Sequence, residues 1–284
     1  MTTNPPISPL ISAEDLAAAM DAPDLKILDA SWRLGGPNMR DSSEAAHIPG
    51  AQFFDLDVVC DPDSALPHML PSPQEFGAAM GAMGVRETDH IVVYDDGGLM
   101  SAPRLWWTFR VFGAERVQVL DGGLPAWQAM GCPVESGFRT PAPETFTARY
   151  RPELVRDYEG VLDVVTGQAA AQIVDARPGD RFRGEAPEPR AGLRGGHMPG
   201  ARCLPMSELY ADGRLKSPEA LRAAFAEAGV DPAQPAVTTC GSGVAASALA
   251  LAQAVLGRDD AAVYDGSWTD WGGRADAPVA TGPA

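Results

Sequence analysis

The chain has 284 residues, with 22 Lys and Arg against 38 Asp and Glu, which gives a formal net charge of −16. Nucleic acids and anionic membrane surfaces attract basic proteins, so this charge disfavours both as partners. The composition, 45% hydrophobic and 21% charged, is that of an ordinary globular protein, and the length suggests two domains of ~150 residues each.

The amino-terminal region has no Lys or Arg before Lys26, so it lacks the basic segment of a secretory signal. The longest apolar stretch, 244–257, has 14 residues, and a membrane-spanning helix needs ~20. We therefore expect a cytoplasmic protein that does not enter a membrane. There are four cysteines and no CxxC pair, so in a reducing compartment we expect free thiols. These cysteines are Cys60, Cys132, Cys203 and Cys240.

The order of short motifs in the first half of the chain returns in the second half. HIPGA at 47–51 corresponds to HMPGA at 197–201, 150 residues later, and DGGLPAW at 121–127 corresponds to DGSWTDW at 265–271, 144 residues later. Self-similarity at one spacing is the mark of a duplicated unit. The sequence therefore predicts two copies of one domain in tandem.

Within each copy, short β-branched runs alternate with Ala- and Leu-rich stretches that are typical of helices. This alternation predicts an α/β fold, with a mainly parallel sheet flanked by helices in each domain. Ser72-Pro73 and Ser217-Pro218 each offer an N-cap followed by a proline at the first helical position. We expect an amino-terminal, non-catalytic domain at 1–140, a linker at 141–155 and a carboxy-terminal, catalytic domain at 156–284.

The spacing between corresponding motifs changes at two places, which locates an insertion in each copy. In the first copy the additional residues fall within FFDLDVVCDPDSALPHML at 53–70, and in the second copy they fall around 177–190. Both segments are polar, contain proline and differ from the repeat around them. We expect them to be loops specialised for function.

Cys240 ends an apolar strand-like run and is followed by GSG and then by a helix-like stretch. Glycines in such a turn let backbone N–H groups and the helix amino terminus face the sulfur, which favours the nucleophilic thiolate. A buried core thiol is the ordinary role of a lone cysteine. However, the first copy has Asp95 at the same place and no thiol in its loop. We therefore expect one copy to carry a reactive group and the site to lie between the halves.

The HxPGA boxes, the DGG and DGS…W boxes and the CGSGV loop at 240–244 together resemble the tandem rhodanese-type sulfurtransferases, over essentially the whole chain. The CGSG loop is similar to that of the 3-mercaptopyruvate branch of this family. The resemblance implies two rhodanese domains, a persulfide on the catalytic cysteine, and no metal or organic cofactor. It also implies that the loop binds substrate. The loop residues are Cys240, Gly241, Ser242, Gly243, Val244 and Ala245.

RFRGEAPEPR at 181–190 is similar to the family segment whose arginines hold the substrate carboxylate and carbonyl, which implies this role for Arg181 and Arg190. A planar guanidinium binds a carboxylate through two hydrogen bonds. From composition alone, this segment could equally be a solvated surface loop.

The 53–70 segment resembles the one that contributes an aspartate and a histidine to a Ser-His-Asp proton relay. This implies a relay of Asp57, His68 and Ser242. His68 could instead only cap or line its loop. For His47 and His197, which occupy one repeat position, we expect a role in the fold.

The resemblance implies transfer of sulfur from 3-mercaptopyruvate through a Cys240 persulfide to a thiol, thioredoxin or cyanide, with release of pyruvate. One alternative is a thiosulfate:cyanide sulfurtransferase, although those enzymes usually have basic residues where this chain has Gly241 and Ser242. Another is a binding module that relays persulfide without turnover. A cysteine phosphatase needs an arginine near position 246, which is alanine here. Ala245 replaces the usual family threonine, a change that should affect efficiency or substrate preference before reaction type.

Overall fold

The computed structural model describes residues 7–97 and 99–284, which divide into two compact units. Unit 1 extends to Pro62 and resumes over Pro71–Arg151, and unit 2 comprises Asp63–Leu70 and Pro152–Ala284. The boundary at 151/152 falls within the expected linker. The end of the inserted segment 53–70 therefore packs with the second unit, where the Leu70 N–H donates to an Asp265 carboxylate oxygen at 2.7 Å.

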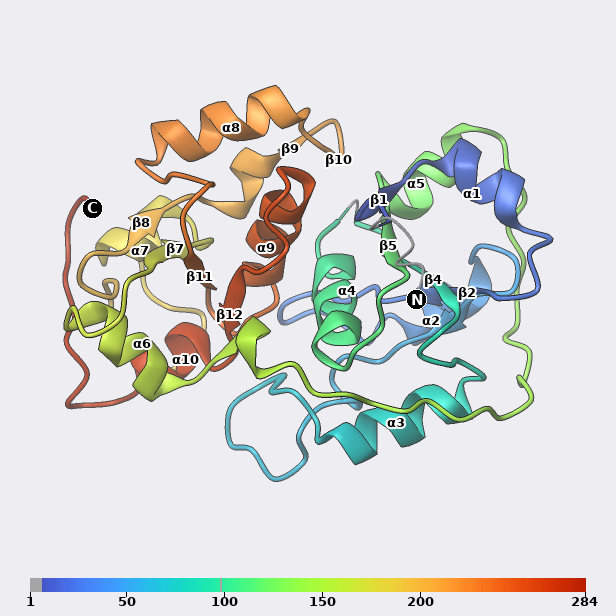
Figure 1. Ribbon diagram of the computed structural model, residues 1–284, viewed down its shortest axis with the longest axis horizontal. Helices are drawn as coiled ribbons and strands as arrows, with labels where there is room; N and C mark the ends of the chain where they lie inside the picture. Colours follow the sequence, from blue (N-terminus) through green and yellow to red (C-terminus); the bar gives the residue numbers. More distant parts are fainter. Residues whose placement is uncertain (1–6, 98) are drawn as a thin grey trace, which may run out of the picture. The chain divides into compact units, whose positions relative to one another are not determined.

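Unit 1 is built on a five-stranded parallel sheet with the strand order β1-β5-β4-β2-β3 (Figure 1). Its elements are β1 (Leu10–Ile11), α1 (Ala13–Ala19), β2 (Leu25–Asp29), α2 (Arg40–Ala45), β3 (Gln52–Phe53), α3 (Pro73–Ala82), β4 (His90–Tyr94), α4 (Ala102–Val111), β5 (Val117–Leu120) and α5 (Gly123–Ala129).

Unit 2 repeats this topology, with a five-stranded parallel sheet in the order β6-β12-β11-β7-β8. Matching strand orders confirm the tandem duplication and the α/β fold. A small antiparallel pair, β9 with β10, is added. The elements are β6 (Val155–Arg156), α6 (Tyr158–Val165), β7 (Gln172–Asp175), α7 (Gly179–Arg183), β8 (Arg202–Cys203), β9 (Tyr210–Ala211), β10 (Arg214–Leu215), α8 (Pro218–Glu227), β11 (Ala236–Thr239), α9 (Ala246–Val255), β12 (Ala262–Tyr264) and α10 (Ser267–Trp271).

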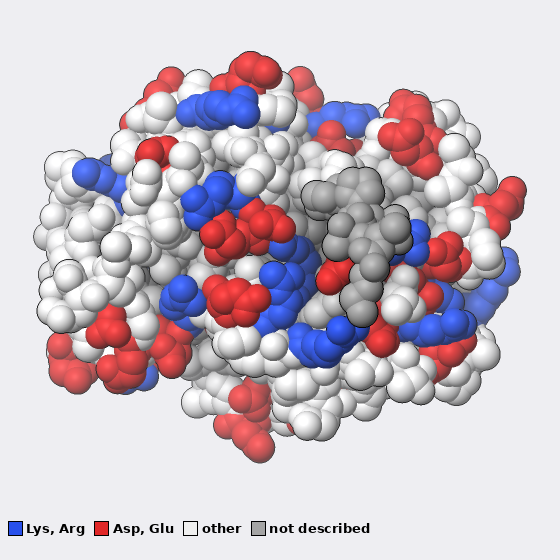
Figure 2. Space-filling model, in the orientation of Figure 1, with Lys and Arg blue, Asp and Glu red and all other residues white. Residues whose placement is uncertain are grey.

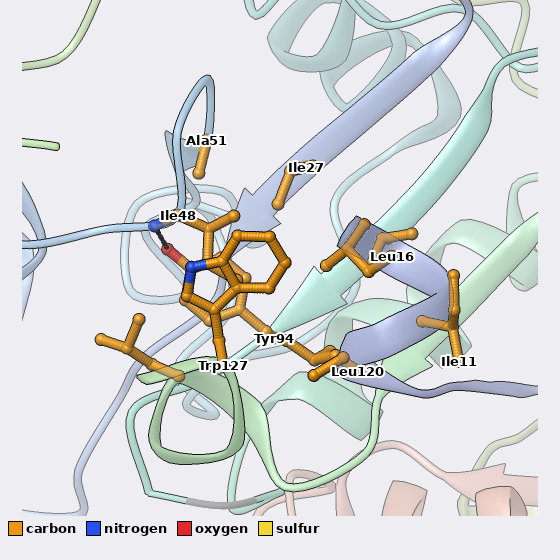
Figure 3. Packing of buried hydrophobic residues seen from close by; sticks show 11 residues of the cluster. Ile11, Leu16, Ile27, Ile48, Ala51, Tyr94, Leu120 and Trp127 are labelled. Atoms are coloured by element: carbon orange, nitrogen blue, oxygen red, sulfur yellow. Dashed lines mark hydrogen bonds between the residues drawn. The ribbon is translucent and has the colours of Figure 1, made fainter. Parts of the chain in front are cut away.

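In each unit, helices cover both faces of the sheet, so the central strands β4 and β11 are buried over most or all of their length. In unit 1, Leu16 of α1 and Trp127 of α5 pack with Ile27 and Tyr94 from neighbouring strands (Figure 3). The Tyr94 hydroxyl accepts a hydrogen bond from the backbone N–H of Ile48 at 3.3 Å. In unit 2 the corresponding layer contains α6 and α10, and α9 packs on β11 and β12.

The expected helix starts are confirmed. Ser72 caps α3 with a complete capping box that includes Glu75, and Ser217 caps α8. The two HxPGA histidines are buried, and each forms an isolated antiparallel bridge, His47 with Glu135 and His197 with Ala280. Their ring Nδ1 atoms lie 2.7 and 2.9 Å from backbone carbonyl oxygens. Both histidines therefore hold the fold together, as the sequence predicts.

On the face drawn in Figure 2, acidic side chains are spread over both units with basic side chains between them. Across residues 7–97 and 99–284, no helix has the length and apolarity that crossing a bilayer requires.

The linker runs closely along α3 (Figure 1). The Glu144 N–H donates to the Gly81 carbonyl at 2.9 Å, and the Phe146 ring packs against Phe76 at 5.4 Å between centroids. A Cβ added to Gly81 would lie only 2.5 Å from the Glu144 carbonyl oxygen. The residue at this position of α3 therefore has to lack a side chain for the linker backbone to approach the helix so closely.

We predict that Gly81→Ala destabilises the protein by roughly 1–3 kcal/mol, because a methyl group there would push the linker backbone away. In an ordinary helix interior the same change would stabilise by ~1 kcal/mol. Urea unfolding measures the difference, and a stability gain would contradict this packing.

Candidate active site

The Cys240 loop connects the end of β11 to the start of α9, at the carboxyl edge of a parallel sheet, where ligands of such sheets bind. Cys240 itself is 3% exposed, and Ser242 and Val244 are also buried. Gly243 has a φ of 78°, a left-handed conformation that glycine adopts without strain. The strand, glycine turn and helix predicted from the sequence are all present.

Residues of α10 form hydrogen bonds with this loop. The N–H of Trp268 donates to the Cys240 carbonyl at 2.9 Å, and the N–H of Thr269 donates to the Gly241 carbonyl at 2.9 Å. The Thr269 hydroxyl adds a hydrogen bond to the Gly241 carbonyl at 2.6 Å. The Ser267 hydroxyl accepts from the N–H groups of Cys240, at 3.2 Å, and Gly243, at 3.0 Å.

The other amides of the loop remain available. Among the residues that the structure describes, none accepts a hydrogen bond from the backbone N–H of Gly241, Ser242, Val244 or Ala245. A buried amide without a protein acceptor is rare, and several close together in a turn form an anion site. Stabilisation of a sulfur anion at Cys240 by these amides stays a prediction.

The first copy has an acidic side chain at the equivalent place, hydrogen-bonded to backbone amides. Asp95 follows β4 as Cys240 follows β11, and its carboxylate accepts from the N–H groups of Leu99, Ser101 and Ala102 at 2.7–2.8 Å. Burial raises the pKa of Asp95, and these backbone hydrogen bonds oppose that shift. The Asp95 carboxyl group thus follows β4 in the first copy as the Cys240 side chain follows β11 in the second.

The two predicted arginines lie beside the loop. A methyl group placed on the Cα of Gly241 would be 3.4 Å from Nη2 of Arg181 and 3.9 Å from Nη1 of Arg190. Arg181 comes from the short helix α7, and Arg190 from the segment that follows it. The space next to the cysteine loop is therefore bordered by guanidinium groups, which suit a substrate carboxylate.

Sequence reasoning missed the carboxylate that holds Arg181. Glu188, with a side chain 2% exposed, accepts from Nε of Arg181 at 3.2 Å and also from its Nη2. Its other oxygen accepts from Nη1 of Arg177 at 2.7 Å, and Arg177 is paired in turn with Asp175 at 2.6 Å. Burial alone would lower the pKa of Arg177, but Asp175 and Glu188 outweigh it and raise that pKa. A buried network of ion pairs thus holds the Arg181 side chain in place.

The proposed relay residues fall in different units. His68 is 8% exposed and adopts a φ of 62° in the segment that packs with unit 2, the unit that also holds Ser242. Asp57 is exposed in unit 1, where both of its carboxylate oxygens lie 3.1 Å from the Trp32 indole nitrogen. The role of this trio stays a prediction.

Two of the other cysteines are poorly suited to nucleophilic chemistry. Burial and the nearby Asp175 raise the pKa of Cys203 to about 11. Burial and the neighbouring acidic residues also raise the pKa of Cys60. Both thiols are therefore protonated near neutral pH, and the thiolate is the reactive form. In the part of the chain that the structure describes, no group of three or more potential ligands is arranged for a metal ion.

Comparison with known proteins agrees with this architecture. The rhodanese-like domain family matches residues 12–130 and 162–274. The chain therefore belongs to the rhodanese family, with two domains in tandem. It is 44% identical over 274 residues to the 3-mercaptopyruvate sulfurtransferase of Escherichia coli (strain K12), which covers 95% of this chain and 96% of that protein.

Two further relatives, one with the same name and one with a different name, are similar over nearly the whole chain. The human 3-mercaptopyruvate sulfurtransferase is 44% identical over 275 residues, 94% of this chain and 92% of that protein. The thiosulfate sulfurtransferase of Rattus norvegicus is 43% identical over 268 residues, 93% of this chain and 90% of that protein. The crystal structure of SseA from Escherichia coli matches with a TM-score of 0.84 at 41% identity, covering 92% of this chain and 99% of that one.

We predict that Glu188→Gln lowers the free energy of unfolding by roughly 3 kcal/mol, because it removes the carboxylate that compensates the charges of Arg177 and Arg181 in a buried setting. Glu185→Gln is the matched control, since Glu185 pairs with Arg183 at 2.8 Å on the surface of the same segment. We expect it to leave stability unchanged. Urea unfolding of both variants tests this, and equal effects would contradict the network.

Proposed function

We propose that this protein transfers sulfur from 3-mercaptopyruvate to a thiol acceptor through a persulfide on Cys240, and releases pyruvate. The observation that carries the proposal is the convergence of a cysteine in an amide-lined turn with two guanidinium groups beside Gly241. The names of the 44% identical relatives support the same donor.

The first half-reaction forms the persulfide. The Cys240 thiolate attacks the sulfur of 3-mercaptopyruvate, so an S–S bond forms and the C–S bond breaks. The electron pair of the broken bond stays on carbon as the pyruvate enolate, which takes up a proton to give pyruvate. Available amides of the loop stabilise the sulfur anion before attack, and after it they stabilise the ionised persulfide.

Arg181 and Arg190 hold the keto acid by its carboxylate and carbonyl, which keeps the donor sulfur in line with Cys240. Their charge also favours the enolate, because negative charge spreads onto the carbonyl oxygen as the C–S bond breaks. We propose that His68, Asp57 and Ser242 move the protons, with His68 suited to transfer near neutral pH.

The second half-reaction discharges the persulfide. An acceptor thiolate attacks the outer sulfur, and the Cys240 thiolate leaves. A small thiol, thioredoxin or cyanide fits this step, and cyanide would give thiocyanate. We propose a cytoplasmic, reducing location, which is supported by the four cysteines, all free thiols in the structure.

Thiosulfate is the second candidate donor, favoured by the 43% identity to a thiosulfate sulfurtransferase. Overall identity does not separate the two donors, because both names occur at nearly the same similarity. The loop does favour one of them, since Gly241 and Ser242 bring no positive charge to a dianionic donor. Comparison of kcat/KM for both donors decides the question, and a higher value with thiosulfate would reverse the assignment.

We predict that incubation with 3-mercaptopyruvate adds one sulfur atom, about 32 Da, to the protein, because the persulfide forms before an acceptor is present. Intact mass spectrometry detects the adduct, and cyanide should remove it. Cys240→Ser should show neither adduct nor turnover. Persistence of the adduct in that variant would place the persulfide elsewhere, and its absence from the wild type would favour a binding module without turnover.

We predict that Arg181→Met slows alkylation of Cys240 by iodoacetate relative to iodoacetamide by roughly tenfold, because only iodoacetate carries a carboxylate for the guanidinium to bind. Peptide mass spectrometry of the Cys240 peptide gives both rates. Arg183→Met, in the same helix but paired with Glu185, is the control and should keep the wild-type ratio. An unchanged ratio in Arg181→Met would remove Arg181 from carboxylate binding.

A further inference from the structure

Ser267 has a backbone conformation that serine rarely adopts. Its φ is 49°, and it is one of four residues other than glycine with a positive φ in the described part of the chain. Left-handed geometry brings the Cβ close to the following carbonyl, so side chains there are strained. Ser267 is also completely buried, so solvent offers its hydroxyl no compensation. Strain of this kind persists where function requires the residue.

The duplicated domain provides an internal comparison. The boxes DGGLPAW and DGSWTDW place Gly123 of the first copy at the position of Ser267. Gly123 has nearly the same φ, 57°. The first copy thus meets this backbone requirement with the residue that adopts it freely, whereas the copy that carries the thiol has serine.

The hydroxyl accounts for the difference. It donates to the Tyr264 carbonyl at 2.8 Å and accepts from the N–H groups of Cys240, at 3.2 Å, and Gly243, at 3.0 Å. These three hydrogen bonds use the one donor and both acceptor lone pairs of a hydroxyl. One side chain therefore fastens the loop at the cysteine and again three residues later.

A second substitution between the copies acts on the same loop. Thr269 of the second copy corresponds to Pro125 of the first. Proline has no N–H, whereas Thr269 donates to the Gly241 carbonyl through both its N–H, at 2.9 Å, and its hydroxyl, at 2.6 Å. One hydrogen bond between these two segments is present in both copies. In the first copy the Leu124 N–H donates to the Asp95 carbonyl at 3.0 Å, and in the second copy the Trp268 N–H donates to the Cys240 carbonyl at 2.9 Å.

We propose that Ser267 is a positioning residue of the reaction, whose hydroxyl binds the loop at Cys240 and Gly243 so that the intervening amides remain directed to the sulfur. Thr269 assists by fixing the Gly241 carbonyl. The tests of this inference that measure turnover rest on the proposed function. The inference itself concerns two residues whose side-chain hydrogen bonds all go to backbone atoms, and it distinguishes the copy with the thiol from the copy without it.

Two substitutions at Ser267 separate backbone strain from hydrogen bonding. Ser267→Ala removes the hydroxyl and keeps the strain. Ser267→Gly removes the hydroxyl and relieves the strain, so it should melt at a higher temperature than Ser267→Ala. Both should lose kcat with 3-mercaptopyruvate by roughly tenfold to a hundredfold, with KM nearly unchanged because the arginines are intact. If Ser267 served stability alone, activity would follow the melting temperature and Ser267→Gly would be the more active variant.

The matched control is Ser247→Ala. Ser247 is also completely buried, and its hydroxyl donates to the Gly243 carbonyl at 3.0 Å without contacting a loop amide. We expect this variant to turn over at nearly the wild-type rate. A loss as large as that of the Ser267 variants would mean that any buried hydroxyl near the loop has the same effect, which would overturn the proposal.

Alkylation of Cys240 by iodoacetamide, followed on its peptide by mass spectrometry, tests the inference without any sulfur donor. We expect both Ser267 variants to react at least several-fold more slowly than the wild type at neutral pH. If the wild type fails with 3-mercaptopyruvate but the variants still alkylate slowly, the proposed function fails and the role of Ser267 stands. Wild-type alkylation rates in both variants would overturn the role of Ser267, whatever the turnover.

Discussion

The chemistry of this protein depends on how one short turn distributes its backbone hydrogen bonds. Backbone N–H groups of helix α10 donate to the carbonyl oxygens of Cys240 and Gly241. The Ser267 hydroxyl accepts from the N–H groups of Cys240 and Gly243, whereas the N–H groups of Gly241, Ser242, Val244 and Ala245 have no protein acceptor among the described residues. In the proposed mechanism, a sulfur anion is the hydrogen-bond acceptor for these N–H groups. In that mechanism the same amides bind a thiolate before the reaction and a persulfide after it.

The two domains use this turn in opposite ways. In the first copy, the Asp95 side chain accepts hydrogen bonds from backbone N–H groups of its own turn, those of Leu99, Ser101 and Ala102. In the second copy Cys240 occupies the equivalent position, and a thiolate can gain and lose a sulfur atom. The turn therefore holds an acidic side chain in the first copy and, in the proposed mechanism, a reactive thiolate in the second, where Ser267 and Thr269 add hydrogen bonds to the loop.

Much of the fold and part of the candidate site were predictable from the sequence, because short motifs reveal the duplication and the local turns and helix starts. The tandem α/β fold, the capped helices at Ser72 and Ser217 and the strand-to-helix turn at Cys240 are confirmed. Glu188 was missed because a glutamate between arginines looks like surface charge until its burial is known. Ser267 was missed because the DGS…W box served only to mark the repeat. That residues 63–70 pack with unit 2 was also hidden, since the length of an insertion does not specify which domain it contacts.

The buried charges next to the turn also bear on the choice of donor. Arg177 and Arg181 are balanced by Asp175 and Glu188, so these four groups bring no net charge to the site. A cluster with no net charge attracts a dianion only weakly. Its ion pairs do, however, fix the direction in which the Arg181 guanidinium points. Directed hydrogen bonds recognise a planar carboxylate better than a tetrahedral sulfonate. Geometry rather than net charge therefore favours the keto acid over thiosulfate in this protein.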